Sequence, residues 1–560
     1  MKKLFLLLLS LATLLACGKA NPGTDPGTDP GTNPVQLTVP ANVHLHSATD
    51  NSLTFQWSAV EGAKGYEWKL TFDAAAVKSG KANGRNVTVD GLMPGTAYGF
   101  SVRAVADGQT SDWSANLDAI TTGQAPAPPD PSAQVVCVDS PIIMEMDHVP
   151  VMGTSGYVRI FKANGTEVDS INLADIATVK VREDGVMVPK EQIVTPSLST
   201  TFMDALSCGS KKRYVHYTPF RIQGTSLIIK PHSGVLDFNT EYYVTVDESV
   251  CGQAVPAGEW SFVTKSAPST TSISVNPDGS ADFCTLQRAL SHAADGATIT
   301  LADGTYPELL YLREKKNITV RGASRTGTVI AYPNSEVYMN GSSNRCLWLV
   351  ENCDNLVLEN LTVENTFGNP KGQAECIYFN SGSNAHKLTI ENCSLISWQD
   401  TFLCKGSVWV HNSLIAGHCD YIWGYPQACL FEDCEIRSRA AGYIVQARIN
   451  NASDKGFVFL NCNLTAESGV ADGTMYLARS GGDSSKYDNV TYSNCAMSPV
   501  IAPAGWYSNP APTPSAPTAV SGWKEYGTTG VSTASRNAYG KLLTAEEAAA
   551  YSSRQAVLGW

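Results

Sequence analysis

The sequence predicts an all-β protein in which a parallel β-helix follows two β-sandwich domains. Hydrophobic residues make up 43% of the 560 residues and charged residues only 16%, while 46 glycines and 29 prolines supply turns. This composition favours turn-rich β structure over helical bundles. Short alternating strands fill the first half of the chain, and polar corners of rough regular spacing fill the second.

The N-terminus predicts export. Lys2 and Lys3 precede the apolar run 4–15, which is too short to span a bilayer and is typical of a signal peptide. The run ends in Leu-Leu-Ala-Cys-Gly at 14–18, which resembles the bacterial lipobox. The resemblance implies that residues 1–17 form a lipoprotein signal and that Cys17 is lipidated. We therefore expect an outer-membrane lipoprotein that faces the periplasm or the cell surface.

Residues 18–36 predict a flexible linker, because their Pro-Gly-Thr repeat contains too few apolar side chains to build a core. Residues 37–123 then alternate in short strands, and with Trp57 and the segment 92–98 they resemble a fibronectin type III domain. A Pro-rich break at 125–131 leads to a second β region, 133–266, which resembles a bacterial Ig-like domain and carries no evident chemistry.

The fifteen cysteines of an exported chain suggest disulfides. Eleven of them follow residue 280, however, several in Asn-Cys or Asp-Cys pairs. Small buried side chains that stack coil on coil explain these equally well. Among the earlier residues, one pair from Cys137, Cys208 and Cys251 is a candidate for a bridge.

The repeated corners predict a β-helix over residues 270–560. Their third residues, 40, 20, 21, 28 and 33 positions apart, are Cys353, Cys393, Ser413, Cys434, Cys462 and Cys495. Steps of about 20 are typical of a solenoid whose coils bury their faces against one another. Near the end, Thr544 and Glu547 form a capping-box pattern, so we expect a short C-terminal helix on the outside.

Two aspartates lie one coil apart. Asp400 and Asp420 are separated by 20 residues, which places them at equivalent positions on strands about 4.8 Å apart. Two carboxylates at that separation couple, so one is expected to hold a proton near neutral pH. An ionised nucleophile beside a protonated acid suits two-step displacement at an ester, although a single Asp at a corner is more often a turn former.

The surrounding motifs resemble those of the pectin methylesterases over roughly 290 residues. In order along the chain they are Gly304–Glu308, Gly372–Ala374, Gln399–Thr401, Ile415–Gly424, Gln446–Arg448 and Leu477–Arg479. The resemblance implies a right-handed parallel β-helix and hydrolysis of the methyl esters of galacturonate in pectin, with release of methanol. It implies no cofactor and no metal.

Carried over residue by residue, the resemblance implies that Asp420 is the nucleophile and that Asp400 is the acid, and later the base. Gln373 and Gln399 would form the oxyanion hole, where one positioned donor contributes about 3 kcal/mol. Arg479 would hold Asp420 ionised and oriented. The residues expected to contact substrate are Gln373, Arg479, Trp423 and Arg448.

The chain departs from the family in two places. Ser480 and Gly481 follow Arg479 where the family has Pro-Trp, so the sugar-stacking Trp is absent. Other aromatic side chains either supply a stacking face or belong to the packing, namely Trp398, Trp423, Tyr425 and Trp506. Glu375 adds a carboxylate near the site, which either faces the groove and repels galacturonate or points into its loop.

Three functions remain open, and the methylesterase leads. A pectate lyase or polygalacturonase is the alternative on the same fold, although no Ca²⁺ cage and no Asp-Asp or Gly-His-Gly element is evident. A non-catalytic polysaccharide-binding lipoprotein is supported by the missing Trp. The net charge of −12 argues against nucleic acid as a partner. We expect a monomer that binds pectin and contacts the membrane through the lipid anchor alone.

Overall fold

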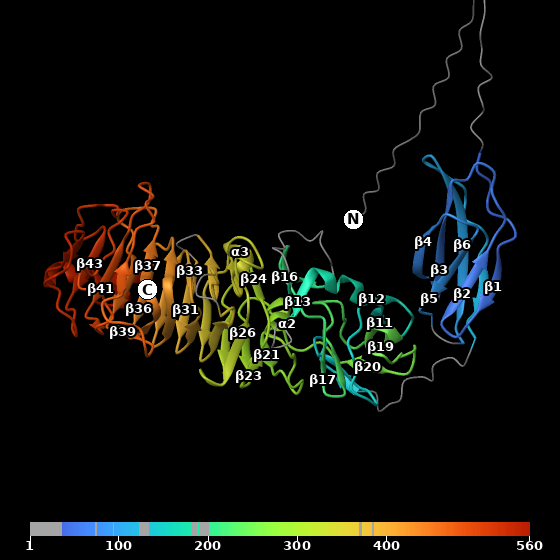
Figure 1. The fold of residues 1–560 in the computed structure, drawn as a ribbon, viewed down its shortest axis with the longest axis horizontal. Coiled ribbons are helices and arrows are strands. Elements are labelled where there is room, and N and C mark those ends of the chain that lie inside the picture. Colours follow the sequence, from blue (N-terminus) through green and yellow to red (C-terminus); the bar gives the residue numbers. More distant parts are fainter. Residues whose placement is uncertain are drawn as a thin grey trace, which may run out of the picture.

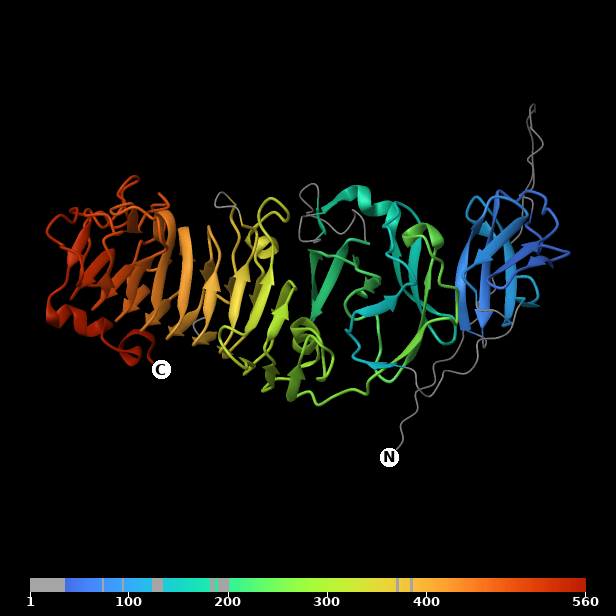
Figure 2. The ribbon, with the colours of Figure 1, turned by 60° about the horizontal axis from the view of Figure 1, so that its bottom comes forward.

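A computed structural model describes residues 36–72, 75–92, 95–122, 134–181, 187–189, 201–368, 372–382 and 386–560. Three β units follow one another from the blue to the red end of the chain (Figures 1 and 2). The predicted lipidation site Cys17 and nearly all of the predicted linker lie outside the described residues. No helix of the described ranges is long and apolar enough to cross a membrane.

The first unit consists of two antiparallel sheets. One has the order β1-β2-β5, and the other has the order β4-β3-β6-β7 with β8 also paired to β6. Phe55 and Phe100 stack between them with ring centroids 3.9 Å apart, and Trp57 is buried beside them. The strands are β1 (His44–Ala48), β2 (Ser52–Gln56), β3 (Gly65–Phe72), β4 (Ala75–Ala82), β5 (Asn86–Asp90), β6 (Ala97–Ala106), β7 (Gln109–Thr110) and β8 (Leu117–Ile120).

The second unit is built on a five-stranded sheet, β12-β11-β19-β20-β9, and a three-stranded sheet, β10-β18-β17. Its core continues into the β-helix, where the Arg213 guanidinium donates to the carbonyl oxygens of Leu310 (2.6 Å) and Asn344 (2.9 Å). Its elements are β9 (Gln134–Val136), β10 (Ile142–Glu145), β11 (Tyr157–Lys162), β12 (Glu167–Asn172), the 3-10 helix η1 (Leu173–Thr178), β13 (Val179–Val181), β14 (Met187–Pro189), β15 (Met203–Cys208), β16 (Lys211–His216), β17 (Phe220–Gln223), β18 (Ser226–Ile229), β19 (Glu241–Val246), α1 (Glu248–Cys251) and β20 (Ser261–Thr264).

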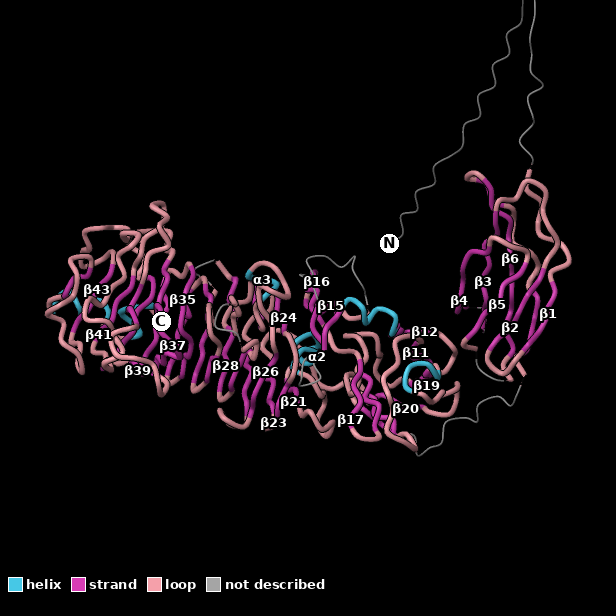
Figure 3. The backbone as a smooth tube through the Cα atoms, viewed as in Figure 1, coloured by secondary structure: helices cyan, strands magenta, loops and turns pink. Residues whose placement is uncertain are grey.

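The third unit is the predicted parallel β-helix (Figure 3), which confirms the fold class. The first of its two long sheets has eleven parallel strands. In sheet order they are β21 (Ser272–Val275), β22 (Thr298–Leu301), β25 (Thr319–Gly322), β28 (Leu356–Glu359), β31 (Lys387–Glu391), β34 (Ser407–His411), β36 (Ala428–Glu432), β38 (Gly456–Leu460), β41 (Val490–Ser493), β43 (Trp523–Tyr526) and β44 (Gly540–Leu542).

The second long sheet has thirteen strands and carries the predicted site. They are β23 (Gly304–Tyr306), β24 (Leu310–Arg313), β26 (Thr328–Tyr332), β27 (Trp348–Glu351), β29 (Thr362–Asn365), β30 (Ile377–Asn380), β32 (Ser394–Ile396), β33 (Phe402–Cys404), β35 (Leu414–Gly424), β37 (Glu435–Ala447), β39 (Asn463–Ala466), β40 (Met475–Ala478) and β42 (Ala496–Met497). The helices of this unit are α2 (Leu286–His292), α3 (Ser342–Arg345), α4 (Ala545–Ala548), η2 (Ala549–Tyr551) and α5 (Arg554–Leu558).

Left-handed residues turn the corners after the strands of the eleven-stranded sheet. The corner residues have φ between 48° and 55°, a region that Asn and Asp enter more readily than other side chains. They are Asn360, Asn392, Asn412, Asp433, Asn461 and Asn494. The corners from Asn392 onward are those that the sequence predicts.

The first predicted corner, Asn352, is left-handed but belongs to the other long sheet. Asn352 follows β27 in the thirteen-stranded sheet, and its N–H lies 3.4 Å from the Asn380 carbonyl oxygen. Asn360 takes the expected place, where its side chain accepts a hydrogen bond of 2.9 Å from Asn392. One coil with a long loop therefore separates Asn360 from Asn392, in place of the step of 40 positions that begins at Cys353.

The C-terminal helices pack on the outside of the β-helix, as predicted. The Thr544 hydroxyl accepts from the Glu547 N–H and the Glu547 carboxylate accepts from the Thr544 N–H, so the capping box is complete. Tyr551 and Val557 then cover Leu430 and Val458 on the outer face of the eleven-stranded sheet.

All fourteen described cysteines are free thiols, and no pair among Cys137, Cys208 and Cys251 is bridged. Several stack inside the β-helix, which is one of the two explanations that the sequence leaves open. Cys434 and Cys462, for example, donate their thiol hydrogens to carbonyl oxygens of the preceding coil at 3.3 and 3.4 Å.

Candidate active site

Asp400 and Asp420 occupy equivalent positions on consecutive coils. The preceding residues, Gln399 and Cys419, are paired in parallel, which confirms the predicted spacing of one coil. Both aspartates have left-handed backbones, with φ of 65° and 48°, and both are almost fully buried, at 3% and 4% exposed. The sheet therefore directs both carboxylates to the same face of the β-helix.

Asp420, on β35, is held by Arg479 and Gln446. The Arg479 guanidinium donates to both carboxylate oxygens, with 2.7 Å between Nε and Oδ1. Gln446, which the sequence did not single out as a site residue, donates from Nε2 to Oδ2 at 3.1 Å. A bidentate charge-assisted pair of this kind stabilises a carboxylate anion in one orientation.

Asp400 is bonded through one oxygen. Arg345 Nη2 and Gln373 Nε2 donate to Oδ2 at 2.9 and 3.0 Å. No residue of the described ranges hydrogen-bonds Oδ1. This oxygen is therefore available to exchange a proton with a bound substrate.

Arg345, at the end of α3, is the main site residue that sequence reasoning missed. Its guanidinium binds Glu375 through Nε and Nη2, and Nη1 donates to Glu336 and to the Gln373 side-chain oxygen, each at 2.8 Å. It lies outside every motif, 28 residues before Gln373, so no local signal indicates it. Glu375 is completely buried and points at Arg345. It therefore does not face the substrate groove, which was one of the two orientations considered from the sequence.

The charges around Arg345 determine where the proton resides. Burial raises the pKa of Asp400 well above its usual range, and the charge of Glu375 raises it further, although Arg345 opposes both. Asp420 was expected from the sequence to couple with Asp400. Its charge raises the pKa of Asp400 less than the charge of Glu375 does. Because one guanidinium is shared by several carboxylates, it cannot keep all of them ionised. The raised pKa therefore favours the protonated form of Asp400.

Gln373 and Gln399 lie side by side on consecutive coils, paired in parallel through their backbones. The Gln373 side chain is fixed between Arg345 and Asp400. The half-buried Gln399 side-chain amide has no hydrogen-bond partner among the described residues. Its N–H groups are thus free to donate to a ligand.

Arg448 and Trp423 lie next to Gln446, the residue that donates to Asp420. Arg448 donates to the side-chain oxygen of Gln446 at 2.6 Å and lies over the Trp423 ring, 5.1 Å from its centroid. Trp423 is only 7% exposed, so little of its ring is available for stacking. Trp506 is 1% exposed and stacks on Trp523, so it belongs to the core and not to a groove.

Three half-buried tyrosines lie beside Arg479, and the sequence did not indicate them. Tyr443 pairs in register with Cys419 and with Tyr476, so these rings continue the row of Gln373 and Gln399 onto later coils. Tyr507 packs against both other rings, with centroids 4.9 and 5.2 Å away. The Arg479 guanidinium lies 5.0 Å from the Tyr443 ring centroid. We name Tyr443, Tyr476 and Tyr507 the tyrosine cluster.

In the described part of the chain, one group of His, Cys, Asp or Glu side chains has the spacing of metal ligands, and it contains no residue of this site. It consists of Cys137, Asp139 and Cys284. The arrangement at Asp400 and Asp420 instead offers an anionic nucleophile, a protonated acid and free amide donors, which together suit acyl transfer from an ester.

Comparisons with known proteins agree with this chemistry. The model of the family described as Pectinesterase matches residues 272–559, and that of the fibronectin type III domain matches residues 38–120. Pectinesterase 31 of Arabidopsis thaliana is 30% identical over 256 residues, which cover 43% of this chain and 77% of that protein. Probable pectinesterase A of Aspergillus niger is 31% identical over 229 residues, 39% of this chain and 67% of that protein. The crystal structure of a pectin methylesterase from Aspergillus niger aligns at 27% identity with a TM-score of 0.44, covering 52% of this chain and 95% of that one.

Proposed function

The chain belongs to the pectinesterase family, and from this premise we propose that its β-helix hydrolyses methyl esters of galacturonate residues in pectin, releasing methanol and leaving pectate. One observation carries the assignment of roles. Asp420 is paired with Arg479, while burial and Glu375 raise the pKa of Asp400, so the two neighbouring carboxylates are suited to opposite protonation states.

In the first step, the Asp420 carboxylate attacks the ester carbonyl carbon and the carbonyl oxygen becomes an oxyanion. The free N–H groups of Gln399 stabilise this charge, together with the second N–H of Gln373. As the intermediate collapses, the C–O bond to the methoxy group breaks. Asp400 then donates its proton to the departing oxygen, so that methanol leaves and an acyl anhydride on Asp420 remains.

In the second step, Asp400 is the base. As a carboxylate it accepts a proton from water, and the oxygen of that water attacks the acyl carbon of the anhydride. The bond to Asp420 breaks, which restores the Asp420 carboxylate and the protonated Asp400. Gln446 and Arg448 orient Asp420. Arg448 donates to the side-chain oxygen of Gln446, and the Gln446 amide donates to the Asp420 carboxylate.

The tyrosine cluster supplies the sugar-binding face that the missing Trp would provide. The apolar face of a pyranose ring packs well on an aromatic ring, and these three rings lie next to Arg479 on the coils that follow the aspartates. Arg479 itself is 31% exposed in its side chain, so part of its positive charge remains open to a galacturonate carboxylate. Glu375 is buried and does not repel it.

The test is product analysis with the full chain, highly methylated pectin and EDTA. We expect methanol without new unsaturated or reducing ends. Unsaturated ends would indicate a lyase, reducing ends a glycoside hydrolase, and the absence of all products a binding protein. Each of these results would overturn the assignment.

We also propose that the chain is a lipoprotein of the outer membrane, which is anchored through Cys17. The support is the sequence at 14–18 and the turn-rich segment that follows it. Replacing Cys17 by Ser should move the protein from the membrane fraction to the soluble fraction. Unchanged sedimentation of the Cys17→Ser variant with membranes would refute the anchor.

A further inference from the structure

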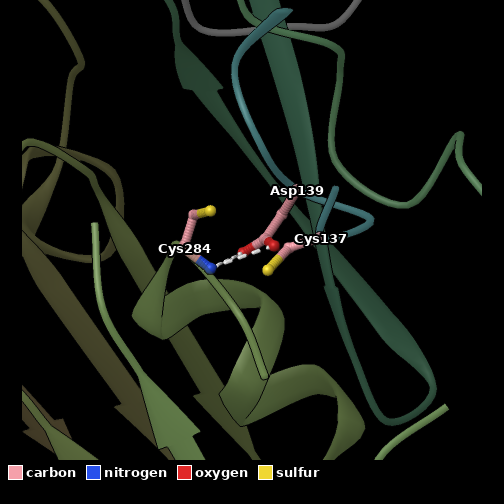
Figure 4. Close-up of side chains that lie close together, drawn as sticks. All are labelled: Cys137, Asp139 and Cys284. Atoms are coloured by element: carbon pink, nitrogen blue, oxygen red, sulfur yellow. Dashed lines mark hydrogen bonds between the residues drawn. The ribbon is translucent and has the colours of Figure 1, made fainter. Parts of the chain in front are cut away.

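Two cysteines meet at the junction between the second β unit and the β-helix. Cys137 follows β9, and Cys284 lies two residues before α2. Both are buried, at 0% and 5% exposed, and their sulfur atoms lie within 4.8 Å of each other and interact (Figure 4).

Hydrogen bonds from both units fix the surroundings of this pair. Asp139 accepts from the backbone N–H groups of Cys284 (3.1 Å) and Thr285 (2.7 Å) at the start of α2. Lys265 donates from Nζ to Cys137 Sγ at 3.3 Å and to the carbonyl oxygen of Gly279 at 2.7 Å. Cys137 Sγ also donates to the Ala281 carbonyl oxygen at 3.3 Å, and Ser140 Oγ lies 3.1 Å from Cys284 Sγ, so each sulfur contacts the other unit.

A metal ion fits this group poorly. The Lys265 ammonium already neutralises a Cys137 thiolate, and a cation would have to lie beside it. Both carboxylate oxygens of Asp139 are taken by donors at the start of α2, including the Thr285 hydroxyl at 2.6 Å. The donor set instead suits an oxidation of the two thiols.

We propose that Cys137 and Cys284 form a disulfide that links the second β unit covalently to the β-helix once the chain is exported. Disulfides form and persist in exported proteins, and the proposal thus rests on the export that the N-terminus predicts. The bond closes a long loop, which is the case in which a disulfide restricts the unfolded chain most.

Cys137 is the resolving thiol, which attacks the sulfur of Cys284. The hydrogen bond with Cys284, assisted by Lys265, lowers the pKa of Cys137 to about 7, which favours the reactive thiolate. Cys284 lines a cavity of about 960 Å³ and Cys137 does not, so a reagent meets Cys284 first.

The oxidant is another disulfide, either on a thiol–disulfide oxidoreductase or on a small molecule. Cys284 gives up its proton, attacks one sulfur atom of the oxidant, forms a mixed disulfide and releases the other sulfur as a thiolate. The Cys137 thiolate then attacks the Cys284 sulfur and displaces the remaining sulfur as a second thiolate. Two electrons and two protons pass to the oxidant, which leaves as two thiols.

The stacked cysteines of the β-helix provide an internal contrast. Cys434 and Cys462 are completely buried and already donate to carbonyl oxygens, and burial raises the pKa of Cys462 well above its usual range. No lysine contacts them in the described part of the chain. We expect them to remain thiols under conditions that oxidise Cys137 and Cys284.

The experiment uses the full chain, isolated from the envelope of an exporting host and trapped at once with acid and N-ethylmaleimide. Peptide mapping without reductant should show one linked pair of peptides, containing Cys137 and Cys284, with the stacked cysteines alkylated after denaturation. Reductant should lower the Tm of the protein by about 5 °C or more, and it should have no such effect on Cys137→Ser or Cys284→Ser. The Cys251→Ser variant, which removes a buried thiol from the same unit, should keep the linked peptides.

A second arm separates the disulfide from the export on which it rests. The reduced full chain is incubated with mixtures of oxidised and reduced glutathione, and the linked peptides are measured. Linkage here, with free thiols in the isolated protein, would uphold the disulfide and count against export. The disulfide is overturned if both thiols stay free in both arms, or if one equivalent of zinc protects them from alkylation.

Discussion

Arg345 Nη2 lies 2.9 Å from Asp400 Oδ2, although 55 residues separate the two in the sequence. The same guanidinium binds the fully buried Glu375 through two nitrogens. One cation is thus divided between carboxylates, and the proton that Asp400 holds depends on a loop that no motif includes.

Glu375→Gln should lower the pKa of Asp400, because the neighbouring charge that raises it is removed and Arg345 is freed to pair with Asp400. The first step needs protonated Asp400, so kcat/KM falls as pH rises through this pKa. The falling limb of the pH profile should therefore move to lower pH. Methanol release measured between pH 5 and about 10 checks the shift.

The control for that shift is Glu359→Gln, which removes a glutamate that is paired with an arginine on the surface. Its profile should match that of the wild type. If the falling limb of Glu375→Gln stays in place, Asp400 is not the group that titrates there.

Asp420→Asn should lower kcat by about 10⁴-fold or more, because an amide cannot form the acyl anhydride. Asn also tolerates the left-handed backbone, so the Tm should change little. The matched control is Asp433→Asn, a left-handed corner residue whose carboxylate is half exposed. Substantial methanol release by Asp420→Asn, measured in the same assay, would refute its role as nucleophile.

Gln399→Ala should lower kcat by about 100-fold, the typical effect of removing one oxyanion donor. The Gln399 side chain bonds no described residue, so its removal should leave the Tm within about 2 °C of the wild type. Kinetics and thermal unfolding of the same sample separate the two effects. An unchanged kcat would show that Gln399 does not face the developing charge.

The sequence predicts the architecture well where one physical rule acts alone. The left-handed corners at Asn392, Asn412 and Asn461 follow from the tolerance of Asn for positive φ, and they fix the coil period on which the alignment of Asp400 and Asp420 depends. Asn352 was assigned to the wrong series of corners, because an Asn-Cys pair also follows β27 in the thirteen-stranded sheet. A local pattern does not identify the corner to which it belongs.

The environment of the site was less predictable, because it depends on long loops. Arg345 reaches Asp400 from α3, and Tyr507 reaches Tyr443 across two coils of unequal length. Because the coils vary from 20 to 33 residues in length, the sequence alone does not show which residues of neighbouring coils lie side by side. Gln446 was within reach of sequence reasoning, since it lies in a motif together with Arg448.

Tyr507→Ala should raise KM for long methylated oligogalacturonates about fivefold to tenfold and leave kcat nearly unchanged, because the ring lies beside Arg479 and not at the reacting carbon. Short substrates that do not reach the tyrosine cluster should keep their KM. Tyr507→Phe retains the stacking ring and should behave as the wild type, and Tyr214→Ala controls for loss of a half-exposed tyrosine in the second β unit. Steady-state methanol release across a series of chain lengths makes the comparison. An equal rise in KM for short and long substrates would show that Tyr507 supports Arg479 and does not bind a distant sugar.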